Sequence, residues 1–223
     1  MSSSACKASP VLALVLLSLA LLPPMFFSTA TSAQGRPFKI VALGDSLSAG
    51  YQLPPGAAFP SVLQRALKEK GIDAEIVNAG VSGDTATGGL DRLDWSVTDG
   101  TQGVILELGA NDALRGTDPD LTYKALDEAI TRLKARGIKV LLAGMRAPPN
   151  MGPDYQKRFD AIYARLAKAH EVMLYPFFLD GIAGDAKLNL PDGIHPTAEG
   201  IRLIVQRMLP TVEAFLKTLP PQS

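Results

Sequence analysis

From residue 38 onward, short runs of aliphatic and β-branched residues alternate with longer segments in which apolar residues recur every three or four positions. Unbroken apolar runs are typical of strands buried on both faces of a parallel sheet, and the longer spacing is typical of helices that bury one face. The pattern predicts five strands, at residues 39–43, 75–78, 103–108, 138–143 and 172–174.

The same pattern, together with capping and breaking residues, predicts the helices between these strands. In the longest of them, Asp118 caps the helix, Pro119 occupies the first turn and Gly137 ends it. Its inner face is expected to begin at Leu121, and Pro210 is expected to kink or split the last helix. The predicted helices cover residues 59–70, about 90–95, 119–136, 154–169 and a final segment from about residue 197.

This alternation of strand and helix defines the expected fold. Strands separated by helices form parallel βαβ units with right-handed crossovers. We expect a three-layer α/β/α sandwich around a five-stranded parallel sheet, with the flavodoxin-like strand order 2-1-3-4-5. The segment 34–223 shows no internal repeat and no linker, so we expect it to be one domain.

Composition and charge narrow the possible partners. The chain has 223 residues, 47% of them hydrophobic, and its 22 basic and 22 acidic residues give a net charge of zero. No basic field for nucleic acid is present, and no Cys/His spacing suggests a metal. The single cysteine, Cys6, excludes an intrachain disulfide. We therefore expect a monomer that uses no metal or other cofactor and acts on small molecules.

Residues 1–33 have the layout of a secretory signal peptide. Lys7 precedes an apolar run at 11–22, and a stretch of small residues follows at 28–33. We expect cleavage after Ala33, with Ala30 as the alternative position. An uncleaved anchor is the competing interpretation, but the apolar run is short and ends at two prolines. The mature protein is expected to be periplasmic or secreted, without a stable membrane anchor.

Residues that can carry chemistry follow four of the five predicted strands. Ser46 follows the first strand, Gly83 the second and Asn111 the third, and Asp192 and His195 lie in the long segment after the fifth. In a parallel sheet, the loops that follow the strands lie at one edge, where ligands bind in open α/β folds. These residues are therefore expected to meet, although each segment alone could be an ordinary turn or cap.

Their chemistry fits acyl transfer. A serine hydroxyl needs an adjacent base, and the sequence offers two histidines. His170 ends a helix just before the last strand and so belongs at the opposite edge, which leaves His195. Asp192, three residues earlier, can orient the imidazole and stabilise its charged form. The backbone N–H groups of Ser46 and Gly83 and the Asn111 side chain are candidate oxyanion donors, although Asn111 could instead form an Asx turn.

Three aspartates, Asp45, Asp84 and Asp112, lie in the same loops, and we interpret them as acceptors for backbone N–H groups that shape these loops. Together the segments resemble the four sequence blocks of the SGNH, or GDSL, hydrolases. The resemblance covers residues 38–216 and rests on residues 44–48, the loop at Gly83, residues 109–112 and residues 192–195. It is greatest to secreted bacterial enzymes of the thioesterase, lysophospholipase and arylesterase type, through residues 78–85, 107–116 and 175–178.

The resemblance implies a serine esterase that hydrolyses aryl, acyl and lysophospholipid esters and acyl thioesters through an acyl-enzyme. It implies a catalytic triad of Ser46, Asp192 and His195, with the Ser46 and Gly83 N–H groups and Asn111 as the oxyanion hole. It also implies a mobile loop at 113–118 beside the acyl pocket, bordered by the proline-rich loop 148–153. The substrate-binding residues implied are Ala113, Leu114, Arg115, Gly116 and Pro149.

Three other functions fit parts of the pattern. An α/β-hydrolase would require Gly-x-Ser-x-Gly, but Ser48 occupies the last position here. A flavodoxin-like protein could bind phosphate in the first loop, but Asp45 and Asp84 would repel the anion. A carbohydrate O-deacetylase on the same fold remains open, although an aromatic content of 6% offers no obvious sugar platform.

Overall fold

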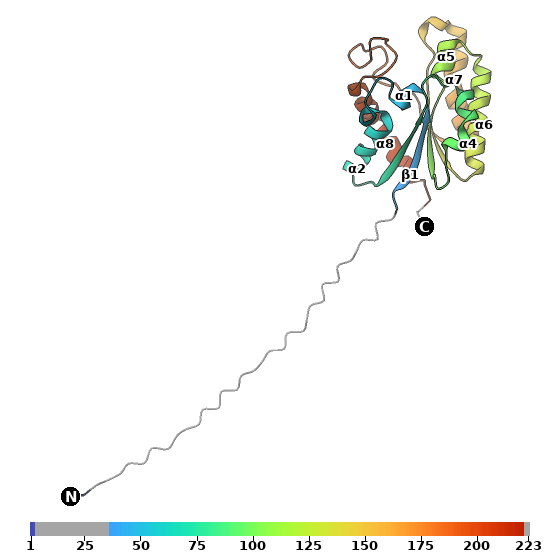
Figure 1. The fold of residues 1–223 in the computed structure, drawn as a ribbon. Helices are drawn as coiled ribbons and strands as arrows, with labels where there is room; N and C mark the ends of the chain where they lie inside the picture. The colour runs from blue at the N-terminus through green and yellow to red at the C-terminus, as the bar shows by residue number, and fades with distance from the viewer. Residues whose placement is uncertain (3–35, 221–223) are drawn as a thin grey trace. The chain divides into compact units, whose positions relative to one another are not determined.

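The computed structural model of the protein describes residues 1–2 and 36–220. Its centre is one five-stranded sheet in the order β2-β1-β3-β4-β5, in which every neighbouring pair is parallel (Figure 1). The predicted sheet topology is confirmed. The strands are β1 (Phe38–Gly44), β2 (Ala74–Gly80), β3 (Gly103–Glu107), β4 (Lys139–Ala143) and β5 (Met173–Tyr175).

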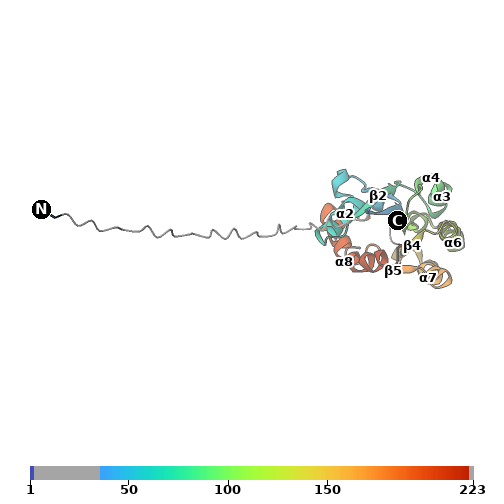
Figure 2. The same ribbon diagram turned by 90° about the horizontal axis from the view of Figure 1, so that it is seen from below.

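Helices cover both faces of the sheet, as the alternating pattern predicts. Figures 1 and 2 show α2 and α8 on one face and α3, α4, α6 and α7 on the other. The short helices α1 and α5 begin directly after β1 and β3. The helices are α1 (Ser46–Ala49), α2 (Phe59–Glu69), α3 (Ala86–Asp91), α4 (Leu93–Ser96), α5 (Ala110–Arg115), α6 (Pro119–Ala135), α7 (Pro153–His170) and α8 (Ala198–Leu216), with 3₁₀ turns η1 (Pro55–Ala57) and η2 (Pro149–Met151).

The neighbouring strands β1 and β3 end at the same level of the sheet. All five residues of β3 are buried, and β1 is buried from Ile40 to its end. Their parallel register pairs Gly44 with Glu107, the last residue of each strand. Because both strands end together, the segments that follow them begin side by side at the carboxyl edge.

Two local predictions were wrong, and one of two alternatives was excluded. One helix was expected at about 90–95, but α3 and α4 form instead, because Thr85 Oγ1 accepts from Gly88 N at 3.2 Å and starts a helix earlier. Of the kink or split expected at Pro210, the split is excluded, because α8 is one helix with buried residues such as Met208 and Val212 on both sides of the proline. The expected loop at 113–118 is helical as far as Arg115, since α5 ends only at that residue.

The inner face of α6 also differs at its first turn. Leu121 is 55% exposed, whereas Thr122 is fully buried. The Thr122 hydroxyl donates to Asp112 Oδ1 at 3.0 Å, a buried carboxylate after β3. This polar contact directs Thr122 inward, and the expected apolar face begins only at Ala125 and continues through Leu126, Ala129, Ile130 and Leu133.

The expected signal peptide at 1–33 and its cleavage position lie, apart from Met1 and Ser2, outside the described residues. Within the described part of the chain, no helix combines the length and apolar character needed to cross a membrane.

Candidate active site

Ser46 is the first residue of α1 and is separated from the end of strand β1 only by Asp45. Asp45 caps this helix, because its Oδ1 accepts from Leu47 N at 2.9 Å. The turn is tight: a Cβ on Gly44 would lie 2.2 Å from Ser48 Oγ, so only glycine fits there. Ser46 is thus held at the carboxyl edge of the sheet, 8% exposed.

The structure brings Ser46, His195 and Asp192 into one hydrogen-bonded chain. His195 Nε2 lies 2.9 Å from Ser46 Oγ across 149 positions of sequence. On the other side of the ring, His195 Nδ1 lies 2.8 Å from Asp192 Oδ2. Nε2 is therefore placed to accept the hydroxyl proton while Nδ1–H donates to the carboxylate.

The local turn at 192–195 explains how Asp192 reaches the imidazole. Asp192 Oδ1 accepts from His195 N at 3.0 Å and from Ile194 N at 2.9 Å, while Gly193 takes a left-handed φ of 71°. The backbone N–H groups of His195 and then Ile194 lower the pKa of Asp192 to about 2. The carboxylate therefore stays charged beside the imidazole throughout the neutral and mildly acidic range.

Tyr51 packs against the imidazole, a contact that the sequence analysis missed. The Tyr51 and His195 ring centroids are 4.3 Å apart with the planes tilted by 34°. Tyr51 lies between Gly50 and Gln52, both with positive φ, in the turn that follows α1. In the sequence, this contact could have been suspected from an aromatic residue directly after Gly50, the glycine that follows the short helix of Ser46.

The candidate oxyanion donors lie in the segments that follow β1, β2 and β3. Gly83 has a φ of 89°, a conformation that favours glycine. In the part of the chain that the structure describes, no acceptor is recorded for the Ser46 or Gly83 N–H. Asn111 Nδ2 donates to Asp84 O at 2.9 Å and to Asp45 Oδ2 at 3.1 Å. One of these two bonds has to be exchanged when Asn111 donates to a substrate.

Two buried carboxyl groups, those of Glu107 and Asp45, lie beside the Ser46–Ser48 turn. Glu107 is fully buried at the end of β3, where its Oε2 accepts from Ser48 Oγ at 2.7 Å and from Asp45 N at 3.4 Å. Its Oε1 has no hydrogen-bond partner among the described residues. Burial, and next the charge of Asp45, raise the pKa of Glu107 well above its usual value. The sequence analysis missed Glu107, although an acid ending an apolar strand was a usable signal.

The raised pKa of Asp45 predicts a specific dependence of the unfolding free energy on pH. Burial raises its pKa to about 6 from an ordinary value of 3.8. The folded protein binds this proton more tightly than the unfolded chain does, so the group stabilises the fold below pH 3.8 and loses that contribution as the pH rises to about 6. Relative to Asp45→Asn, wild-type unfolding free energy should fall by on the order of 3 kcal/mol across this window. Urea unfolding at a series of pH values measures this, and parallel curves would contradict it.

Two of the three aspartates that were expected to bind backbone N–H groups do so. Asp45 accepts from Leu47 N, and Asp112 Oδ2 accepts from Ala86 N at 2.8 Å. The third interpretation was wrong, because the carboxylate of Asp84 pairs with the Arg92 guanidinium at 2.5 Å. Among the described residues, no group of three or more His, Cys, Asp or Glu side chains could hold a metal ion.

A mainly apolar cavity of about 470 Å³ opens beside the triad. Of the expected substrate-binding residues, Ala113, Leu114 and Pro149 line it. Arg115 and Gly116 are not among its lining residues: Arg115 donates to Gly83 O at 2.9 Å, and Gly116 ends α5 in a left-handed conformation. Other apolar residues that line the cavity are Leu47, Met145, Ala147, Phe177, Leu179 and Ile194.

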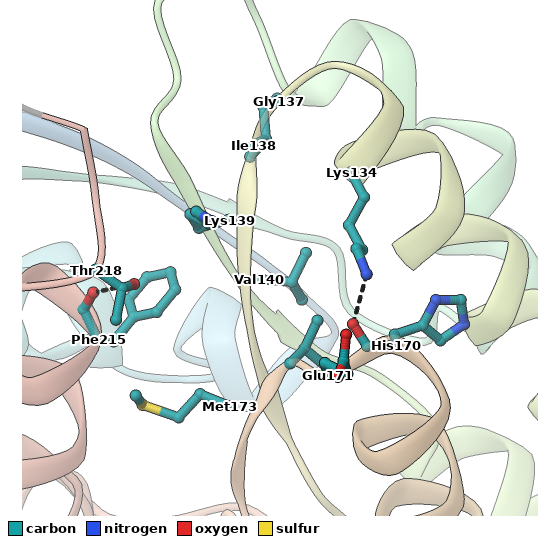
Figure 3. A pocket seen from close by; sticks show the side chains of 11 residues that line it. Lys134, Gly137, Ile138, Lys139, Val140, His170, Glu171, Met173, Phe215 and Thr218 are labelled. Atoms are coloured by element: carbon teal, nitrogen blue, oxygen red, sulfur yellow. Dashed lines mark hydrogen bonds between the residues drawn. The ribbon is translucent and has the colours of Figure 1, made fainter.

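His170 lies at the opposite edge of the sheet, as predicted. It ends α7, and its Nε2 lies 2.7 Å from Asp127 Oδ1. It lines a cavity of about 630 Å³ together with Lys139 and Val140 at the start of β4. The Lys134 ammonium donates to the His170 carbonyl (Figure 3). This histidine is therefore remote from Ser46.

Replacing His170 with alanine is expected to leave kcat unchanged within about twofold, because only a partly exposed pair with Asp127 is lost. Steady-state hydrolysis of a p-nitrophenyl ester measures this. A large loss of kcat in a folded His170→Ala protein would show that the wrong histidine had been chosen as the base.

A parallel α/β/α sandwich with a hydrogen-bonded Ser, His and Asp at its carboxyl edge places the protein in the class of serine hydrolases. A model of the GDSL-like Lipase/Acylhydrolase family matches residues 42–203. The chain belongs to this family, as the sequence blocks predicted.

Individual relatives agree with this assignment. The chain is 41% identical to an arylesterase of Vibrio mimicus over 78% of its own length and 88% of that protein. It is 37% identical to thioesterase 1/protease 1/lysophospholipase L1 of Escherichia coli, over 84% of this chain and 89% of the relative. Among solved structures, AlinE4, an SGNH-hydrolase family esterase, matches at 43% identity and a TM-score of 0.70, covering 82% of this chain and 98% of AlinE4.

Proposed function

We propose that this protein is a serine esterase that hydrolyses carboxylic esters through an acyl-enzyme on Ser46. The observation that carries the proposal is the chain from Ser46 Oγ to His195 Nε2 at 2.9 Å and from His195 Nδ1 to Asp192 Oδ2 at 2.8 Å. A nucleophile, a base in contact with it and a carboxylate that orients the base are the three parts of nucleophilic acyl transfer.

In the acylation step, Ser46 Oγ attacks the ester carbonyl while its proton moves to His195 Nε2. The resulting imidazolium is stabilised by Asp192, which its two backbone N–H donors keep ionised. Negative charge develops on the carbonyl oxygen and is met by the Ser46 and Gly83 N–H groups and by Asn111 Nδ2. His195 then gives the proton to the leaving alcohol or thiol, and the acyl group remains on Ser46.

Deacylation repeats the same steps with water as the nucleophile. His195 Nε2 takes a proton from water, and the hydroxide adds to the acyl carbonyl. The tetrahedral intermediate then expels Ser46 Oγ, which recovers its proton from the imidazolium. The acid is released and the free serine is restored.

The apolar cavity beside the triad supports acyl or aryl groups as the part of the substrate that is recognised. Ala113, Leu114 and Pro149 are proposed to contact this group, because they line the cavity together with other apolar side chains. A carbohydrate O-deacetylase would need polar or aromatic contacts for a sugar, and the lining does include Arg146, Gln156, Asp160, Asn189 and Phe177. The exposed surface of the cavity is nevertheless mainly apolar, which favours an acyl or aryl group over a sugar. Acyl thioesters and lysophospholipids are proposed as further substrates, since relatives carry thioesterase and lysophospholipase names.

The test is a series of p-nitrophenyl esters of increasing acyl length, beside acyl-CoA and lysophospholipid. We expect kcat/KM to rise from acetate to a longer acyl chain, because the cavity buries more apolar surface. Turnover of acetate alone, together with deacetylation of a glycan, would support the deacetylase instead. No turnover of any ester by folded protein would end the proposal.

We also propose that residues 1–33 are a signal peptide removed after Ala33, so that the mature protein acts in the periplasm or outside the cell. The layout of apolar and small residues in the sequence supports this. Mass spectrometry of protein recovered from the periplasm tests it, and an intact amino terminus would contradict it. All candidate site residues come from one chain, which supports a monomer, and light scattering of the purified protein tests that.

A further inference from the structure

Arg92 is a buried cation that no part of the proposed mechanism uses. It lies between α3 and α4 and is 6% exposed. Its Nε binds Asp84 Oδ2 at 2.5 Å, and its Nη2 donates to Gly44 O at 2.8 Å. Its Nη1 donates to Ala79 O at 2.8 Å and to Ser96 Oγ at 3.1 Å. One side chain therefore joins three segments: the end of β1, the end of β2 with the loop after it, and α4.

Two of these acceptors lie next to candidate oxyanion donors. Gly44 precedes the Asp45–Ser46 turn, and Asp84 follows Gly83 directly. The carbonyl of Asp84 in turn accepts from Asn111 Nδ2 at 2.9 Å. Through these contacts a single guanidinium is linked to the loop of Ser46, to the loop of Gly83 and, through Asp84, to the side chain of Asn111. None of its hydrogen bonds is to Ser46 or His195.

The two loops that Arg92 joins pack tightly against each other. Val81 N donates to Gly44 O at 3.0 Å, so this carbonyl is shared with Arg92. A Cβ on Gly80 would lie 2.3 Å from Ala49 N and 2.8 Å from Asp45 O. The loop after β2 thus rests directly on the loop that carries Ser46, and a shift of one moves the other.

Arginine is the residue type that this position requires. A guanidinium presents five N–H donors in a fixed plane and stays charged when buried. Here it meets two carbonyls, a hydroxyl and a carboxylate that approach from different segments. A lysine ammonium is a single point with three donors and could not reach all four acceptors.

We propose that Arg92 is a positioning residue for acyl transfer: it holds the loop of Ser46 and the loop of Gly83 in register, so that the oxyanion donors point to one place. The inference rests on the proposed esterase function. Arg92 acts only through Gly44, Ala79 and Asp84 and does not touch the reacting atoms.

The variant Arg92→Met keeps an unbranched side chain about as long as the arginine stem up to Nε and removes every donor. We expect its kcat to fall about a hundredfold with KM changed by less than about threefold, because small displacements of aligned groups cost rate more than binding. Arg92→Lys should recover part of the loss. Activity is measured per folded molecule, by active-site titration with a phosphonate ester and by circular dichroism.

Arg136→Met is the matched control. Arg136 is more exposed than Arg92, with 29% of its side chain accessible, but it also donates to a backbone carbonyl, that of Val97, and pairs with Asp94 at 3.7 Å. It contacts neither catalytic loop. We expect Arg136→Met to lose stability and to keep its kcat, which separates a general loss of packing from a loss of positioning.

A second readout distinguishes positioning from damage to the fold. Inactivation by a phosphonate ester needs both the nucleophile and the oxyanion donors, whereas binding of a fatty acid product needs the cavity. In Arg92→Met the inactivation rate should fall about a hundredfold while product affinity stays within about threefold. If Arg92→Met does not fold, Asp84→Asn, which weakens the same contact but keeps the arginine, should show the same split with a smaller loss.

Three results would overturn the inference: unchanged kcat in a folded Arg92→Met protein, equal losses of inactivation rate and product affinity, or an equal loss of kcat in Arg136→Met. A failure of the proposed esterase function can be told apart from a failure of this inference. Wild-type protein that hydrolyses no ester would refute the esterase, whereas active wild-type protein with an unaffected Arg92→Met variant would refute only the role of Arg92.

Discussion

Replacement of Ser46 by alanine is expected to lower kcat by about a millionfold, to the level that the oxyanion donors and binding alone provide. The substitution removes the atom that forms the acyl-enzyme, and His195 then has no nucleophile to deprotonate. Release of p-nitrophenol by wild-type and variant protein at equal concentration measures the effect.

The fold should survive this substitution. Among the residues that the structure describes, the Ser46 side chain hydrogen-bonds only to His195 Nε2, and the cap of α1 is made by Asp45. Circular dichroism and thermal unfolding should therefore match the wild type closely, and a fatty acid product should still bind. A burst of p-nitrophenol from pure Ser46→Ala protein would show that the covalent step lies elsewhere.

Replacement of Asn111 by alanine should lower kcat by between about a hundredfold and a thousandfold, with a smaller change in KM. The amide is proposed to meet the oxyanion, whose charge is greatest in the transition state. The same change removes a donor from Asp45 Oδ2, which lies 3.1 Å from Asn111 Nδ2 and whose pKa that bond lowers. Steady-state kinetics with one ester gives both parameters.

Gln64→Ala is the control for this prediction. Gln64 also carries a side-chain amide, but its Oε1 accepts from Ile76 N at 2.8 Å, in the first half of β2 and away from the segments of Ser46 and Gly83. We expect its kcat to stay within about twofold of wild type. An unchanged kcat in Asn111→Ala would remove Asn111 from the oxyanion hole, and a rise in KM alone would assign it to substrate binding instead.

Much of the fold could be predicted because its signals are local. Unbroken apolar runs such as that of β3 predict buried parallel strands, and the parallel rule then places every following segment at one edge. Asp192 and His195 could be paired from sequence because a single turn joins them. His170 could be set aside because its place before β5 puts it at the other edge, as the structure shows.

Other features depended on contacts that no local pattern contains. Leu121 has the spacing of a core residue, yet it is exposed. The hydrogen bond from Thr122 to Asp112 places Thr122 on the inner face of the first turn of α6 instead. The expected loop from Ala113 is helical because α5 continues to Arg115. Periodicity describes which face of a helix is apolar, but not which polar group a distant loop presents to it.

The sequence by itself determined the parallel α/β class, the edge at which the site lies and the residue types available there, because these follow from hydrophobic spacing and chain order. The tertiary structure alone decided how that site is held: Tyr51 against the imidazole, Glu107 under the serine turn and Arg92 between the two loops. Each of these contacts either joins segments that are distant in the chain or depends on the direction of a side chain, and local sequence patterns contain neither. A buried charged or polar group also interacts strongly only after the folded chain has excluded water from it.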